Sequence, residues 1–205
     1  MAIENRRNQS EVEFALLGYL YQRPMHAYEM HQHLVSHGGL GLVWNLNQGR
    51  LYALLAKLER QGLITSQLEP QVGRPPRKIL HLTEHGRDSF LAWLHAPVTG
   101  ARNMRMEFMA KLVFLRELNA AEAAVLLDEQ RDLCDEWLTS LNAQADALQA
   151  TESFEWLVFK FRIGQVQAML NWIATCQGIV EHGVSDAPVR HSSLASPTPQ
   201  GSTPG

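Results

Sequence analysis

The 205-residue chain is long enough for one domain of ordinary size or two small ones, and it carries a formal net charge of −3. This acidic total does not exclude nucleic acid as a partner. Residues 47–87 hold seven Lys/Arg and three Asp/Glu (net +4), whereas residues 88–205 hold eight and fourteen (net −6). No apolar run approaches the roughly 18 residues of a membrane span, and the polar first residues lack a secretion signal. We therefore expect a soluble cytoplasmic protein.

Two short helices are expected at the N-terminus. Ser10 and Glu13 have the spacing of a capping box, which predicts a helix that begins at Ser10. Pro24 separates this helix from a second one, predicted from Ala27 to about Ser36. The apolar positions assigned to the two helices are Phe14, Leu17, Leu20, Tyr28, Met30, Leu34 and Val35.

The stretch from Leu46 to Ile64 predicts a third helix with two contrasting faces. Its apolar stripe has the spacing i, i+3, i+4, i+7 and consists of Leu51, Leu54, Leu55 and Leu58. The opposite face has small side chains edged by cations and one phenol: Gly49, Ala53, Ala56 and Arg60, flanked by Arg50, Tyr52 and Lys57. Small residues let a helix backbone enter a DNA groove, and basic residues meet the phosphates on either side. We expect Gln48 and Arg50 to contact base edges, and Gly62 to end the helix in a left-handed conformation.

A hairpin is predicted after this helix. Residues 63–69 and 77–83 are β-rich, and the turn between them is expected to carry Arg74, Arg77 and Lys78. A helix followed by a hairpin with a basic tip is the layout of a winged helix-turn-helix DNA reader. The alternative is a core helix followed by a solvated hairpin. The DNA-binding interpretation is favoured because both elements place their cations away from the apolar stripe.

The rest of the chain predicts helices. Thr83 caps a fourth helix that ends before Pro97, and Asn119 caps a long one. Some 30 residues of helix would span about 45 Å. Together with a final helix over about residues 152–181, this leaves more apolar surface than one chain can cover, which predicts a second copy as partner. The residues assigned to this dimerisation surface are Phe108, Leu112, Leu115, Trp137, Phe159 and Trp172.

The expected architecture is therefore mainly α, with two domains. Residues 1–96 form the winged helix-turn-helix domain, and residues 104–182 form a helical dimerisation domain beyond a short linker at residues 97–103. The Ser-, Pro-, Thr- and Gly-rich residues 183–205 are expected to be a disordered tail.

These motifs resemble the PadR family of bacterial transcriptional regulators. The resemblance covers residues 14–94 and is carried by Leu16-Leu17-Gly18-Tyr19-Leu20, Pro24-Met25-His26-Ala27-Tyr28, Gly49-Arg50-Leu51-Tyr52, Gly73-Arg74-Pro75-Pro76-Arg77-Lys78 and Leu82-Thr83-Glu84-His85-Gly86. The C-terminal part is similar to the long-tailed branch of the family, with Phe108, Lys111, Leu115 and Trp172 in fitting places. The chain has Ala27 where the family usually has Gly, and Ile79 and Leu80 where a Tyr pair is frequent.

The resemblance implies a homodimer that binds a palindromic operator, usually as a repressor. It also implies that release from DNA often follows binding of a small aromatic or phenolic acid. Two alternatives stay open: a ligand-independent activator of the same family, and a winged helix used only for protein contacts. The latter would need an acidic or apolar outer face on the third helix, whereas this face is basic.

Other kinds of chemistry have weak support in the sequence. It contains no nucleophile elbow, phosphate-binding loop, dinucleotide-binding turn or HExxH motif, so no enzyme is expected. His26, His31, His33 and His37 lie within twelve residues, but polar surface explains them better than a metal. Cys134 and Cys176 predict buried thiols in a reducing compartment. Trp93, Trp137, Trp156 and Trp172 are candidates for an effector pocket, although core and dimer-interface roles are the favoured explanation for each.

Overall fold

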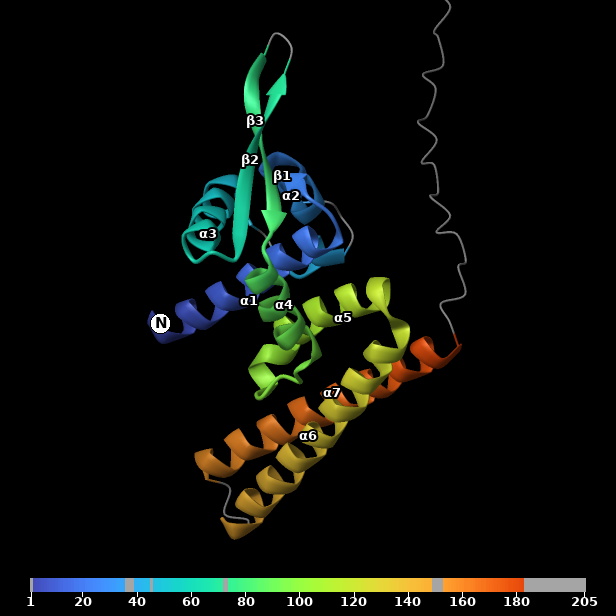
Figure 1. The fold of residues 1–205 in the computed structure, drawn as a ribbon. Helices are drawn as coiled ribbons and strands as arrows, with labels where there is room; N and C mark the ends of the chain where they lie inside the picture. Colours follow the sequence, from blue (N-terminus) through green and yellow to red (C-terminus); the bar gives the residue numbers. More distant parts are fainter. Residues whose placement is uncertain (1, 36–38, 45, 72–73, 149–152, 183–205) are drawn as a thin grey trace, which may run out of the picture.

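A computed structural model describes residues 2–35, 39–44, 46–71, 74–148 and 153–182. Its helices and strands form two regions: a helical unit around a small sheet, and a pair of long helices, α6 and α7, packed beneath it (Figure 1). The elements in chain order are α1 (Ala2–Gln22), β1 (Met25–His26), α2 (Ala27–Val35), the 3-10 helix η1 (Gly39–Leu42), α3 (Gln48–Arg60), β2 (Ile64–Gln71), β3 (Arg74–Leu82), α4 (Glu84–His95), the 3-10 helix η2 (Ala101–Arg105), α5 (Glu107–Leu118), α6 (Ala120–Ala147) and α7 (Phe154–His182).

The first helix is longer than the capping box predicts. It begins at Ala2, so Ser10 lies inside α1 and the predicted start is wrong. Residues 2–9 contain neither glycine nor proline, and nothing in their sequence stops the helix from continuing toward the N-terminus. The second helix, α2, matches its predicted limits, but only Met30 and Leu34 are buried. Tyr28 and Val35, which were assigned to the core, are exposed.

The third helix, α3, confirms the predicted stripe. Leu51, Leu54, Leu55 and Leu58 are all buried, and their burial fixes which side of the helix faces outward. Asn47 is the N-cap, because its side-chain oxygen accepts a hydrogen bond of 2.9 Å from the backbone N–H of Arg50. Gly62 follows the helix with φ 71°, the left-handed conformation that a glycine adopts without strain.

The sheet has the strand order β1-β3-β2, with both pairings antiparallel. The wing, defined here as β2 and β3, is longer than predicted because β3 begins at Arg74. Arg77 and Lys78 therefore lie on the strand and not in the turn, opposite Glu69 and Leu68 of β2. The short strand β1 pairs with Ile79 and Leu80 alone, so the stretch of β3 that contains Pro75 and Pro76 has no pairing with β1.

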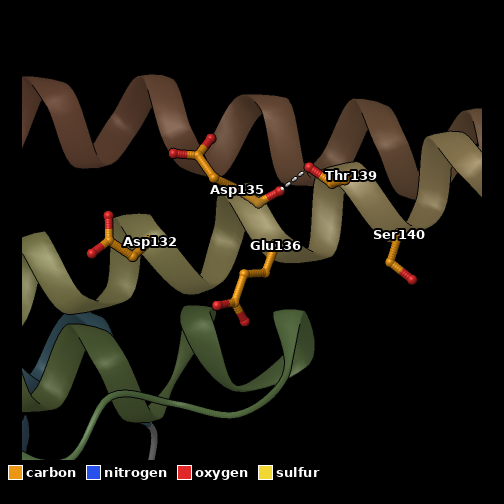
Figure 2. A pocket seen from close by; sticks show the side chains of 5 residues that line it. All are labelled: Asp132, Asp135, Glu136, Thr139 and Ser140. Atoms are coloured by element: carbon orange, nitrogen blue, oxygen red, sulfur yellow. Dashed lines mark hydrogen bonds between the residues drawn. The ribbon is translucent and has the colours of Figure 1, made fainter.

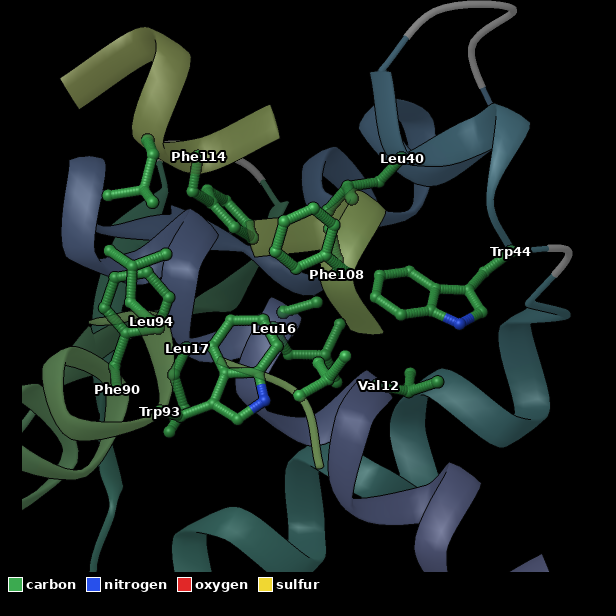
Figure 3. Close-up of a cluster of buried hydrophobic side chains, with 14 of the residues drawn as sticks. Val12, Leu16, Leu17, Leu40, Trp44, Phe90, Trp93, Leu94, Phe108 and Phe114 are labelled. Carbon is green, nitrogen blue, oxygen red and sulfur yellow. The ribbon is translucent and has the colours of Figure 1, made fainter. Parts of the chain in front are cut away.

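A single hydrophobic core joins the sheet unit to α5. Figure 3 shows Phe108 and Phe114 of α5 beside Leu16 and Leu17 of α1 and Phe90 of α4. Phe114 meets Phe90 edge to face, with ring centroids 5.5 Å apart. A Cβ atom on Gly18 would lie 2.4 Å from Cζ of Phe114, so α1 and α5 approach this closely because residue 18 is glycine. The buried cluster continues through residues 97–103, and the domain boundary predicted there stays a prediction.

The long helices α6 and α7 pack side by side along their length (Figure 1). Asn119 caps α6 as predicted, accepting a hydrogen bond of 3.0 Å from the backbone N–H of Ala121. The buried residues of α7 are Ile163, Val166 and Ile173, which form one narrow stripe. Because this stripe covers only part of the circumference, α7 keeps a second apolar face that its own chain leaves uncovered.

Several further expectations bear on these regions. Thr83 caps α4, accepting a hydrogen bond of 3.0 Å from the N–H of Gly86. Cys134 and Cys176 are free thiols, and burial raises the pKa of both. Within the described part of the chain, no helix combines the length and apolarity needed to cross a bilayer. The predicted disordered tail at residues 183–205 lies outside the described residues.

Candidate nucleic-acid interface

The outward face of α3 consists of the exposed residues Gln48, Gly49, Arg50, Tyr52, Ala53, Ala56 and Arg60. It lies opposite the leucine stripe and carries cations at both ends of the helix. Tyr52 is 48% exposed, so its ring is half free to meet another surface. The small residues at positions 49, 53 and 56 let another molecule approach the helix backbone between these charges. This geometry matches what a DNA groove requires of an inserted helix.

Lys57, which was predicted as a DNA contact beside this face, forms an ion pair with α1 in the unbound chain. Its ammonium donates a hydrogen bond of 2.6 Å to Oε1 of Glu13, whose side chain is 10% exposed. The contact joins α3 to α1 at the edge of the core. A charge already paired with a nearly buried carboxylate is a weaker phosphate ligand than a solvated one, so Lys57 orients α3 in the unbound chain.

The wing supplies the second group of cations. Arg77 is exposed on β3, and Lys78 is exposed with its ammonium 3.7 Å from Oε2 of Glu59. At that distance, with the lysine side chain 61% exposed, the pair is weak and the ammonium can reach a phosphate. The backbone of Arg74 begins β3, which places this residue next to the end of the hairpin.

Tyr28 is a candidate contact that sequence reasoning missed, because its position in α2 resembled a core position. Its side chain is 62% exposed in the first turn of α2. His26, directly before that helix, lies with Nδ1 2.8 Å from the carbonyl oxygen of Lys78 and Nε2 3.5 Å from Oε2 of Glu69. The start of α2 is therefore linked to the wing. In the sequence, the polar residue Gln32 follows Tyr28 by one helical turn (i, i+4), and this spacing is the signal that could have placed Tyr28 on an exposed face.

The histidine cluster does not converge in the described structure. His26 contacts the wing backbone, whereas the ring of His33 stacks on Tyr19 with centroids 5.7 Å apart. His37 lies outside the described residues. Among the residues that are described, no three His, Cys, Asp or Glu side chains come together as a metal site would require.

The predicted dimerisation residues fall into two groups. Phe108 and Leu115 are fully buried inside the single chain, so they are unavailable to a partner in this conformation. Trp172 packs edge to face on Phe108 at 6.1 Å, and Leu112, Trp137 and Phe159 are half-buried. The exposed apolar face of α7 consists instead of Phe154, Leu157, Val158 and Phe161. Their spacing of i, i+3, i+4 and i+7 forms one stripe, with Phe154 76% and Phe161 67% exposed.

A cavity of about 250 Å³ lies between the start of η2 and the α6–α7 pair. Its walls are residues 99–101, Trp137, Leu141 and Val166, together with the polar side chains of Ser140, Gln144, Arg162 and Gln165. Of the four tryptophans considered as pocket residues, Trp137 alone lines this cavity. Trp93 packs against Phe14 in the core, and Trp156 lies under the ammonium of Lys160 at 5.5 Å.

A shallow depression on α6 has the opposite character. Figure 2 shows its lining residues, which project from successive turns: Asp132, Asp135, Glu136, Thr139 and Ser140. The hydrogen bond drawn there joins the Thr139 hydroxyl to the backbone carbonyl of Asp135 at 2.9 Å. Three carboxylates at helical spacing repel phosphate, so this side of α6 is unsuited to DNA.

Comparison with known proteins gives matches to both regions. The model of the family described as "Transcriptional regulator PadR-like family" matches residues 16–92, and the model described as "Virulence activator alpha C-term" matches residues 104–181. The chain is similar to the negative transcriptional regulator PadR of Bacillus subtilis, with 27% identity over 142 residues, which are 68% of this chain and 76% of the relative.

Solved structures of the same Bacillus subtilis regulator are also similar. The complex with operator DNA is 24% identical, covers 82% of this chain and 98% of its own, and gives a TM-score of 0.40. The complex with p-coumaric acid is 22% identical, covers 83% and 99%, and gives a TM-score of 0.39. At these TM-scores the whole-chain superpositions are loose.

Proposed function

The chain belongs to the PadR family of transcriptional regulators, and from this we propose that it is a homodimer that binds a palindromic operator. Proteins of this family regulate transcription through DNA and are not enzymes. The observation that carries the proposal is the outward face of α3, with its small residues between Arg50 and Arg60 and a fully buried opposite stripe. In a dimer the two copies of α3 would enter successive major grooves, about 34 Å apart.

Within this scheme the cations have separate roles. Gln48 and Arg50, at the N-terminal end of α3, would contact base edges, since glutamine pairs with adenine and arginine with guanine in the major groove. Arg74, Arg77 and Lys78 of the wing would contact phosphates or the adjacent minor groove. Tyr52 and Ala53 lie between the two groups on the outward face, where they would pack against base edges and sugar.

The proposed dimer contact is the exposed face of α7. Phe154, Leu157 and Phe161 would meet the same helix of a second copy about a twofold axis, which makes the contact self-complementary. Trp137, Phe159 and Trp172, which were predicted for the dimer contact, are half-buried against their own chain. The apolar surface on α7 is the kind that soluble chains cover with a partner.

We favour repression over activation. The Bacillus subtilis relative is a negative regulator, and a dimer seated on a promoter palindrome excludes polymerase directly. The second candidate is activation, because the model that matches residues 104–181 takes its name from virulence activators. Transcription in vitro from a promoter bound by the chain distinguishes the two: a fall in transcript supports repression, and a rise supports activation.

The cavity beside η2 is the proposed effector site. Trp137 offers a ring for stacking and Arg162 a cation for a carboxylate, a combination that fits a small aromatic acid. A ligand there would touch residues 99–101, which lead from α4 to η2 and face the α6–α7 pair across the cavity. It would release DNA only if it bound the DNA-free arrangement more tightly, and a difference of about 3 kcal/mol would suffice.

Two experiments test the proposal. Selection from a random-sequence duplex library should yield a palindrome with half-sites one helical turn apart, and enrichment of no sequence would contradict sequence-specific binding. A gel-shift titration with hydroxycinnamates and hydroxybenzoates, followed in parallel by tryptophan fluorescence, tests the effector. Quenching together with release supports an aromatic acid. Neither effect at millimolar ligand would remove that part of the proposal and leave the DNA-binding part intact.

A further inference from the structure

The segment between α4 and η2 is held by buried polar side chains instead of running freely between two domains. Lys111 of α5 is only 1% exposed, and its ammonium donates a hydrogen bond of 2.6 Å to the backbone carbonyl of Ala96. The same ammonium lies 2.9 Å from Oε1 of Glu107 and 5.1 Å from the ring centroid of Trp93. It therefore ties the end of α4 to α5.

Gln130 of α6 holds the next turn of the same segment. Its side chain is fully buried, accepts a hydrogen bond of 2.7 Å from the backbone N–H of Val98 and donates one of 3.2 Å to the carbonyl of Val98. An amide that pairs with both the N–H and the C=O of one residue fixes the position and the rotation of that backbone. Because α6 belongs to the long helix pair, Gln130 locks the segment onto that pair.

The contacts continue to α1 and to the cavity. Asn103 of η2 donates to Oε1 of Glu11 at 2.6 Å and to Oε2 of Glu107 at 3.0 Å. We call Glu11, Asn103, Glu107, Lys111 and Gln130 the polar joint. Residues 99–101, which line the cavity described above, lie between the parts of the backbone that the joint holds.

Stability alone does not explain why these groups are buried. A buried charged pair contributes little more to folding than well-packed apolar side chains of the same volume, and often less, because both charges lose their hydration. What such a group adds is direction: a hydrogen bond constrains angle as well as distance, whereas apolar contacts allow sliding. Ala96 and Asn103 are thus held to the sheet unit and Val98 is held to α6, so the segment gives the two regions one relative orientation.

We propose that Lys111 and Gln130 are positioning residues that together fix the angle between the sheet unit and the α6–α7 pair: Lys111 holds the segment to α5 of the sheet unit, and Gln130 holds it to α6. In the dimer, on which this inference rests, that angle sets the distance between the two copies of α3. The joint thereby determines which half-site spacing the protein accepts. A molecule bound in the adjacent cavity would contact the backbone that the joint holds. Its binding would therefore change the distance between the two copies of α3.

The first test measures the angle without DNA. Spin labels at Gln61→Cys, on the end of α3, and Asn142→Cys, on α6, report the distance between the two regions of one chain. The background carries Cys176→Ala, and Cys134 is fully buried, so the labels react at the introduced sites. Labelled chains are diluted with unlabelled ones, which leaves only the distance within a chain. The variants are Lys111→Met, Gln130→Met and the two combined, because methionine fills a similar volume without these bonds.

The wild type should give one narrow distance distribution, and the combined variant should broaden it about twofold or more. The matched control is Gln177→Met, which removes a 2.6 Å bond to Asp128 within the α6–α7 pair and leaves the joint intact. This control should stay narrow. A narrow distribution in the combined variant, with its melting transition preserved, would overturn the proposal. If the combined variant fails to fold, Asn103→Ala is measured instead, because Asn103 is only half-buried and its replacement disturbs the core less.

The second test uses DNA. Duplexes selected with the wild type are remade with the half-sites moved apart or together by one and two base pairs. Wild-type affinity should fall about tenfold or more per shift, whereas the joint variants should lose less than about threefold, because a loosened angle adapts to each spacing. Equal spacing profiles for wild type and variants would overturn the proposal. Failure of the wild type to bind any duplex would contradict the proposed function instead, and the distance measurement would then decide on the joint.

Discussion

The sheet unit and the α6–α7 pair differ in what they leave uncovered. In the sheet unit, α3 buries its entire leucine stripe and exposes cations and small residues. In the long helix pair, α7 buries one stripe against α6 and exposes Phe154, Leu157 and Phe161. The first surface suits a polyanion and the second suits another apolar surface. The comparison teaches that the two proposed partners, DNA and a second copy, would use different regions, so each interaction can be removed separately.

The largest expected effect comes from the exposed face of α7. Leu157→Glu combined with Phe161→Glu should produce a monomer at micromolar concentration, because carboxylates cannot be buried in an apolar contact without a partner. Affinity for a palindromic duplex should fall about 100- to 10,000-fold, since the half-sites are no longer linked, while binding to a single half-site stays unchanged. Sedimentation and gel shift measure the two quantities. Gln167→Glu, exposed on the same helix, is the control, and a dimeric double variant would contradict the assignment.

The next effect tests whether α5 belongs to the sheet unit. Phe114→Ala removes a fully buried ring that packs on Tyr19 and Phe90 and closes over Gly18, and it should cost about 3–5 kcal/mol of stability.

Because the core is continuous, a fragment of residues 1–118 should fold, whereas a fragment that ends at Pro97 should melt at a much lower temperature. Circular dichroism of the two fragments measures this. Equal melting temperatures would support the boundary at residues 97–103.

Base contacts by α3 should give a smaller and more selective loss. Arg50→Ala should cost about 1–3 kcal/mol on the selected operator and less on random duplex, because a lost base contact affects only the sequence it reads. Gln48→Ala should behave in the same way. Fluorescence anisotropy on both duplexes measures the difference. Arg131→Ala, an exposed cation of α6, removes the same charge and should have little effect on either. Equal losses on operator and random duplex would show that Arg50 contacts backbone.

The wing should respond differently again. Arg77→Ala should weaken binding to operator and random duplex alike, and it should reduce the slope of log affinity against log salt by about one, as expected for one lost phosphate contact. Titrations at several salt concentrations measure the slope. A loss confined to the operator would transfer Arg77 to the group of base-reading residues.

The smallest effect concerns a contact between the two regions. Nε2 of His95, at the end of α4, lies 2.7 Å from Oε2 of Glu122 in the first turn of α6. The hydrogen bond from His95 is the main cause that holds the pKa of Glu122 below its ordinary value. A carboxyl with a lowered folded pKa contributes stability above its unfolded pKa of about 4.3 and loses it as pH falls through the folded value. Glu122→Gln should therefore melt slightly earlier than wild type at pH 6, and the difference should vanish toward pH 3.

Local signals made several helix limits of the fold predictable. The leucine spacing defined α3, Thr83 and Asn119 defined two helix starts, and Gly62 defined one helix end, because each depends on residues within one turn. The extra turns of α1 and the longer wing were missed because capping and turn residues mark positions where a helix or strand can begin. The helix α1 begins before its capping box, and the strand β3 begins before its predicted first residue.

The proposed dimer face and the polar joint could not be predicted from such local signals. Phe108 and Leu115 look like any interface residue in a helical pattern, and only the tertiary packing of α5 shows that they are covered. Lys111 reads as a solvated lysine on an amphipathic helix. Its burial depends on a hydrogen bond to the carbonyl of Ala96. This contact is made by tertiary packing, so helix periodicity cannot predict it. The same burial lowers the pKa of Lys111, an effect that Glu107 partly offsets.

The two prolines of β3 bear on how the protein behaves when crowded. Between Arg74 and Arg77, β3 pairs with β2 and has no pairing with β1, and the ladder shifts register between Glu69 and Gln71. Successive backbone N–H groups of a strand point to opposite edges, so Pro75 and Pro76 together remove a donor from each edge. An extended arm without those donors is a poor template for a further strand. The long wing can therefore project from the protein without recruiting neighbouring chains into a shared sheet, and replacing both prolines would expose it to aggregation.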